Sequence, residues 1–259
     1  MCNGGEITGW ELSSTDEIEQ ITSALNKIAE TNTASDGSVF LFAVGDGNHS
    51  LATAKAVWDE YKEELKQMGK SEKEIAECPV RYALIEIVNI YDSGLTFEPI
   101  HRVVFNINTE KLINYLKDKL EGSVSELNSE KELNEAVKKS SADFGFVFSD
   151  QNKTKKYILL STKIKELAVA RLQPEIDNFL KTQTDTPNAK IDYIHGEDEV
   201  FRLGTKENTT GILLPPIAKD SFFETINGRG PLPRKSFSMG EADEKRFYLE
   251  CRKLFSDNL

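Results

Sequence analysis

The sequence predicts an α/β fold, with α+β character, in which helices flank a mixed sheet. Two apolar, β-branched runs at residues 39–44 and 82–91 have the length and composition of buried strands. Other segments, such as residues 15–28 and 108–120, repeat apolar side chains at helical spacing. Because the two patterns alternate along the chain, we expect both runs in one sheet, with a helix at residues 47–66 packed across it.

Composition excludes several classes of protein. The chain has 259 residues, of which 39% are hydrophobic and 29% charged, and no apolar run approaches the ~20 residues that span a bilayer. A net charge of −11 argues against a broad nucleic-acid surface. The first residues lack the pattern of a secretion signal, and Cys2, Cys78 and Cys251 lack metal-ligand spacing. We therefore expect a cytoplasmic protein with reduced thiols and with neither membrane nor nucleic-acid partners; the oligomeric state stays undefined.

The chain divides into three predicted parts. Residues 1–107 form a core that carries the most informative turn, and residues 108–162 form a small α+β insert of two Lys/Glu-rich helices and a hairpin. Residues 163–259 form a C-terminal, mainly helical part that packs back on the core. It includes a helix beginning near residue 167 and a basic loop rich in Gly and Pro.

The turn at residues 45–50 is the strongest candidate site. It follows the first apolar run and precedes an amphipathic helix, and its sequence is Gly45, Asp46, Gly47, Asn48, His49 and Ser50. Asp46 or Asn48 is a natural N-cap, and the unpaired N–H groups of a helix start are able to bind an anion. The alternative interpretation is a well-capped turn that binds nothing.

Three histidines and several basic residues provide the other candidates. Each histidine follows a strand-like stretch: His49, His101 and His195. Arg102, Arg229, Arg234 and Lys235 supply cations that match phosphate oxygens, so a phosphate-binding nest is one interpretation. A zinc site is the competing one, although no two histidines have the short helical spacing of many zinc sites. There is no G-x-S-x-G elbow, dinucleotide fingerprint or Walker A lysine.

Five blocks, in order, carry a resemblance to a known family: GDGNHSLATAKAVW, RYALIEIVNIYD, FEPIHRVV, DYIHG and LPRKSFSMGEA. Together they resemble family 1015 of the domains of unknown function. The GDGNHS turn is similar to the D-G-H-H-R turn of that family and of the ParB/sulfiredoxin-like superfamily, which is related to free-serine kinases. Asn48 stands where the family usually has its first histidine, and Ser50 where it has arginine. Since members are usually longer, Met1 is expected to begin a fragment.

The resemblance implies a ParB/sulfiredoxin-like core. It also implies that the protein is a kinase-like phosphotransferase, which acts on a small hydroxylated metabolite such as free serine. Pyrophosphate or a nucleotide would be the donor, and Mg²⁺ bound by Asp46 the cofactor. The implied catalytic residues are Asp46, His49 and His101. The implied phosphate-binding residues are Gly45, Gly47, Asn48, Ser50, Arg102, Arg234 and Lys235, with His195 as a further candidate.

Two alternative functions remain open. One is a regulatory protein that binds a nucleotide or phosphate without turnover, and the other is a metal-assisted phosphohydrolase that uses the histidines. In each case the partner is a small phosphorylated ligand. Because basic groups end strands where α/β ligand sites commonly form, we expect His49 and His101 to face one cleft, with Arg102 nearby and residues 228–236 at its rim.

Overall fold

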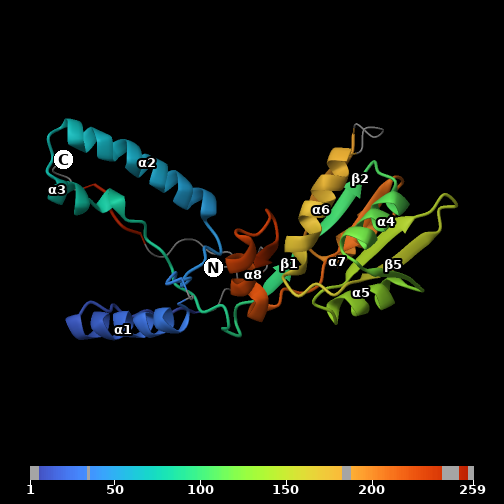
Figure 1. The fold of residues 1–259 in the computed structure, drawn as a ribbon, viewed down its shortest axis with the longest axis horizontal. Coiled ribbons are helices and arrows are strands. Elements are labelled where there is room, and N and C mark those ends of the chain that lie inside the picture. Colours follow the sequence, from blue (N-terminus) through green and yellow to red (C-terminus); the bar gives the residue numbers. More distant parts are fainter. Residues whose placement is uncertain (1–5, 34–35, 183–187, 241–250, 256–259) are drawn as a thin grey trace. The chain divides into compact units, whose positions relative to one another are not determined.

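The computed structural model describes residues 6–33, 36–182, 188–240 and 251–255. Within it the chain forms two compact units, residues 1–89 with 246–259 and residues 90–245 (Figure 1). This division differs from the predicted boundaries after residues 107 and 162. Parts of the predicted N-terminal core and C-terminal part, including residues 1–5 and 241–250, lie outside the described residues.

The first unit is built from helices joined by extended segments. Its elements are α1 (Thr15–Thr31), α2 (Asn48–Gln67), α3 (Glu72–Ala76) and the 3₁₀ turn η1 (Pro79–Arg81). Ser14 and Ser71 each cap a helix reciprocally with the glutamate three residues later. These reciprocal caps satisfy N–H groups at both helix starts, and the helices predicted at residues 15–28 and 47–66 are confirmed. No helix within the described ranges is long and apolar enough to cross a bilayer.

The sheet predicted from residues 39–44 and 82–91 is wrong. Both segments are irregular, and the first makes a single isolated bridge, from Val39 to Thr33. Most of their large side chains are about half exposed, from 47% at Val39 to 63% at Ile85, and Phe40, Leu41 and Ile90 are more buried. A β-branched sequence favours an extended backbone, but a strand also needs a neighbour to complete its hydrogen bonds. Neither segment belongs to either of the two sheets in the described part of the chain.

The second unit contains a six-stranded sheet in the order β3-β5-β4-β7-β2-β6. The strands are β2 (His101–Phe105), β3 (Ser123–Leu127), β4 (Phe144–Ser149), β5 (Lys155–Ser161), β6 (Lys190–Ile194) and β7 (Thr209–Leu213). All described pairings are antiparallel, so the sheet is not mixed in strand direction. Residues 108–162 supply three adjacent strands of this sheet and are continuous with the strands outside that range. A separate pair joins β1 (Phe97–Pro99) to β8 (Phe237–Met239).

Helices cover both faces of the six-stranded sheet. These are α4 (Thr109–Lys119), α5 (Glu130–Lys138), α6 (Ala168–Thr182) and α7 (Glu197–Gly204). Later in the chain come η2 (Lys219–Ser221) and α8 (Phe222–Arg229). α5 and α7 pack against the face that carries Val103 and Val147. α4 and α6 lie on the other face, where Thr109 hydrogen-bonds Thr210 at 2.6 Å and Gln173 accepts from Arg102. The α/β fold class, an antiparallel sheet flanked by helices, is confirmed.

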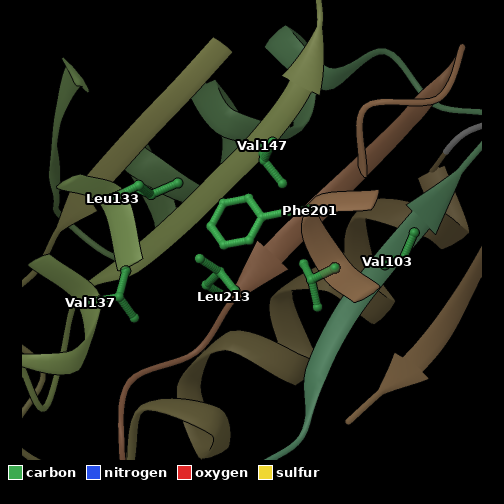
Figure 2. Packing of buried hydrophobic residues seen from close by; sticks show 7 residues of the cluster. Val103, Leu133, Val137, Val147, Phe201 and Leu213 are labelled. Carbon is green, nitrogen blue, oxygen red and sulfur yellow. The ribbon is translucent and has the colours of Figure 1, made fainter. Parts of the chain in front are cut away.

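The core under α5 and α7 is a cluster of buried apolar side chains. It comprises Val103, Leu133, Val137, Val147, Val200, Phe201 and Leu213. Figure 2 shows the ring of Phe201 among Leu133, Val147 and Leu213. Burying side chains of this size contributes roughly 1.5–3 kcal/mol each. This packing fixes β2, and with it the two residues His101 and Arg102 at its start.

Candidate anion site

The turn before α2 has the predicted form but not the predicted cap. Gly47 is the N-cap residue in a left-handed conformation, with φ of 81°, and no side chain caps the helix. Glycine adopts this conformation without steric strain because it has no Cβ. The Asp46 side chain accepts a hydrogen bond from the Gly47 N–H at 2.8 Å, and Asn48 is the first helical residue. The N-cap predicted at Asp46 or Asn48 is therefore wrong.

The start of α2 retains donors that no side chain satisfies. The helix has 20 residues and no acidic residue in its first turn, and Gly45 through Ser50 are all exposed. The first N–H groups of a helix carry partial positive charge and lack intrahelical partners. Anion binding at this turn agrees with that arrangement and stays a prediction.

His101 is buried and neutral. Its Nδ1 accepts a hydrogen bond from the Leu214 backbone N–H at 3.1 Å, which leaves the ring proton on Nε2. Burial lowers its pKa to about 4, while the charge of Glu197 acts in the opposite direction. Nearby Arg102, Lys138 and His195 lower the pKa further. At neutral pH His101 is therefore a hydrogen-bond donor through Nε2 and adds no positive charge to a phosphate site.

Arg102 is completely buried, with 0% of its surface exposed. Its Nε donates to Gln173 Oε1 at 2.7 Å, and its Nη1 donates to the carbonyl oxygens of Ile100 and His101. Nη2 is buried and has no hydrogen-bond partner among the described residues. Buried polar groups in native proteins are nearly always hydrogen-bonded, so this nitrogen is exceptional.

The charge of Arg102 is also uncompensated at short range. No carboxylate in the described part of the chain lies within ion-pair distance of it. Arg102 is connected to the Asp177 carboxylate only indirectly, through Gln173, whose Nε2 donates to Asp177 at 2.9 Å. Burial lowers the Arg102 pKa to about 10, opposed by Tyr193 and Asp177. At neutral pH the side chain is still a cation.

Tyr193 brings a second arginine to this place. The Arg102 guanidinium lies over the Tyr193 ring at 4.7 Å from its centroid, and β2 and β6 pair these two residues directly. Arg234 lies 5.7 Å from the same centroid, and its Nε donates to the Tyr193 hydroxyl at 3.0 Å. The structure thus brings together Arg102 and Arg234, two predicted phosphate-binding residues. Lys235 follows Arg234 and is exposed.

Other predicted site residues are not brought together. His101 and Arg102 are consecutive in a strand, so their side chains point to opposite faces of the sheet and do not form one basic pair. His195 is exposed on the chain that leads into α7. His49 belongs to the first unit and His101 to the second, so their shared cleft stays a prediction. Among the described residues no group of three His, Cys, Asp or Glu is placed to hold a metal ion.

Residues 1–179, more than half of the chain, match DUF1015, described as a protein of unknown function. The chain belongs to the DUF1015 family. No match was found among curated proteins.

Solved structures show a weak likeness to this DUF1015 chain. A conserved hypothetical protein from Pyrococcus furiosus is 12% identical, with a TM-score of 0.44 over 86% of this chain and 83% of that one. A mutant free serine kinase in complex with AMP is 12% identical, with a TM-score of 0.44 over 86% and 80% of the two chains. The same mutant of that kinase, in complex with ADP, is 9% identical, with the same TM-score and coverage. A likeness of this size supports no conclusion about activity or ligand.

Sequence reasoning missed Tyr193 and Gln173. Gln173 is 2% exposed and shares the apolar face of α6 with Val169, Leu172 and Ile176, so a polar residue at a core position was the available signal. Tyr193 lies two residues before His195 in a short strand, and its sequence context carries no comparable signal.

Acidification tests the neutral state of His101. In the unfolded chain a histidine binds its proton near pH 6.5, whereas His101 in the native state does so near pH 4. The unfolded state therefore binds more protons between these values, and the free energy of unfolding falls as pH decreases through this window. From pH 6.5 to 4.5 we expect a loss on the order of 2 kcal/mol. It is measured by hydrogen exchange of the β2 amides.

The chosen pH window separates His101 from Glu197. Lys138 holds the Glu197 pKa at about 2, so that carboxylate loses its stabilising effect only below pH 4.5. The matched variants are His101→Gln and, as a control at an exposed histidine, His195→Gln. We expect a flatter profile only in His101→Gln. Identical slopes in all three proteins would show that His101 is not the group responsible.

Proposed function

We propose that this DUF1015 protein is a cytoplasmic phosphotransferase. Its substrate would be a small hydroxylated metabolite such as free serine, and its donor pyrophosphate or a nucleotide. The observation that best supports this proposal is Arg102, a buried cation that, among the residues described, has no carboxylate in ion-pair distance and one nitrogen without a partner. A small anion is the group that would satisfy both its charge and its free donor.

The other predicted residues have roles consistent with phosphoryl transfer, which depends mainly on positioning and charge stabilisation. The N–H groups at the start of α2 would bind phosphate oxygens, and Arg234 and Lys235 would add positive charge. His49 would donate a hydrogen bond to the ligand, and His101, on the opposite face of the sheet from Arg102, would donate through Nε2 to a part of the ligand other than the phosphate at Arg102. A relation to the ParB/sulfiredoxin-like superfamily is part of this proposal.

Asp46 fits the demands of Mg²⁺. That ion is usually held by one or two carboxylates together with phosphate oxygens and waters. Asp46 is exposed, and its carboxylate accepts a hydrogen bond from the Gly47 backbone N–H. When bound, Mg²⁺ supplies positive charge that neutralises phosphate oxygens. Asp46 would hold it beside the α2 N-terminus, where a bare anion would otherwise be repelled by the carboxylate.

A labelled-phosphate assay tests the proposal. The full chain is incubated with Mg²⁺, labelled pyrophosphate or ATP, and a panel of serine, other hydroxylated amino acids and polyols. We expect label on at least one acceptor. Binding without transfer would favour the regulatory function, and release of inorganic phosphate without an acceptor would favour the phosphohydrolase. If the chain neither binds nor transfers phosphate, all three functions are contradicted.

A further inference from the structure

We propose that Arg102, Tyr193 and Arg234 form a phosphate subsite anchored at Arg102 Nη2. This inference rests on the proposed function, since it names the protein groups that hold one phosphate of its ligand. It lies entirely within the unit of residues 90–245.

A buried charge without a partner destabilises a folded protein. Removing a cation from water is expensive unless a partner compensates it. Three more exposed arginines of this unit each have a carboxylate partner: Arg202 pairs with Glu199, and Arg229 and Arg171 pair with Glu166. Arg102 is more buried than any of these, yet it has no such carboxylate in the described part of the chain. An anionic ligand would supply the missing charge.

The free donor at Arg102 Nη2 has a geometry that suits phosphate. Arginine commonly binds a carboxylate with two parallel N–H groups on different nitrogens. Here Nε is bound to Gln173 and Nη1 to two backbone carbonyls, so only Nη2 remains. The planar fork is therefore not available. A phosphate has more acceptor oxygens than a carboxylate and they diverge in three dimensions, so one oxygen would bind Nη2 and others would remain for Arg234, which favours phosphate.

Arg102, Tyr193 and Arg234 form layers from the interior of the unit to its surface. Arg102 is buried, Tyr193 is half-buried and Arg234 is exposed, and both guanidinium groups lie near one aromatic ring. Two cations that repel each other are thereby held at the same ring, a cost that a shared anion would remove. Arg234 is exposed and contacts Tyr193 through one side-chain hydrogen bond and the ring, among the described residues, so its displacement would give a ligand access to the buried layer.

The competing explanation is that Arg102 is a structural residue only. Its bonds to Gln173 and to the Ile100 carbonyl tie β2 to α6 and need no ligand. That explanation predicts no Arg102-dependent binding of phosphate, so titration of the protein separates the two.

Calorimetric titration of the full chain provides the test, with inorganic phosphate, pyrophosphate and L-serine as separate probes. We expect saturable binding of phosphate or pyrophosphate, weakened at least about 10-fold in Arg102→Met because a charge-assisted hydrogen bond is lost. Arg234→Gln, at an exposed position, should weaken it by about 3-fold or more and covers the case in which Arg102→Met does not fold. Arg202→Gln is the matched control and should bind like the parent chain.

Three results overturn the subsite. They are no phosphate binding by the parent chain, unchanged affinity in both Arg102→Met and Arg234→Gln, and Arg102-dependent binding of L-serine without binding of phosphate. Failure of the proposed function looks different. Arg102-dependent phosphate binding without any transfer would refute the phosphotransferase and keep the subsite. Phosphoryl transfer with unchanged donor affinity in both variants would refute the subsite and keep the phosphotransferase.

Discussion

Replacing Gly204 with alanine should destabilise the unit of residues 90–245 by about 1–3 kcal/mol, as expected for overpacking in a dense core. A Cβ at this last residue of α7 would lie 2.7 Å from the Gly211 backbone nitrogen and 2.8 Å from the Val147 carbonyl oxygen. Both are backbone atoms of central strands. Neither is able to move without disturbing the ladder between β4 and β7.

Gly228 in α8 provides a matched control for this substitution. A Cβ there meets nothing within 4 Å, so Gly228→Ala should be neutral or stabilising by up to about 1 kcal/mol. Denaturant unfolding, followed by hydrogen exchange of the β4 and β7 amides, compares the two variants. Equal stability of both variants would mean that α7 does not approach the sheet as closely as described.

Asp46→Asn should lower phosphoryl transfer by about 100- to 1000-fold, provided that the Asp46 carboxylate holds Mg²⁺. Loss of a metal that stabilises transition-state charge is worth several kcal/mol, which corresponds to this factor. Asparagine retains an oxygen that accepts the Gly47 N–H, so the turn should keep its shape. The rate is measured at saturating donor over a range of Mg²⁺ concentrations.

Asp59→Asn is the control for the loss of one negative charge. Asp59 is exposed on the same helix, α2, where it pairs with Lys55 at 2.5 Å. Such a surface pair contributes little to stability, so this variant should retain the parent rate and Mg²⁺ dependence. A parent-like Mg²⁺ dependence in Asp46→Asn would remove Asp46 from the metal site.

The helices and most strands of the second unit were predictable because their signals are local. Asn108 caps α4 through its side chain, and the apolar runs that became β4 and β5 are joined by a short turn and pair with each other. β3 was missed because Ser123–Leu127 is largely exposed, as befits an edge strand, and has little apolar content. Its place depends on β5, a partner that a local pattern does not identify.

The same limit explains the error at residues 39–44 and 82–91. Their composition indicates an extended backbone, but pairing depends on which other segment lies beside them. At the site, the residue types of Arg102 and Arg234 indicated anion binding. Their meeting at Tyr193 depends on the register of β2 with β6, and the burial of Arg102 depends on α6. Adjacency of His101 and Arg102 was misleading because a strand alternates its side chains.

The central claim, phosphoryl transfer to a small hydroxylated acceptor, is tested most directly by one measurement on the full chain. It is the amount of label that passes from pyrophosphate or ATP to the hydroxyl group of free serine and related acceptors, with Mg²⁺ and after its removal by chelation. We expect time-dependent, Mg²⁺-dependent labelling of an acceptor. Acceptors that stay unlabelled at saturating donor, while the protein binds that donor, would contradict the claim.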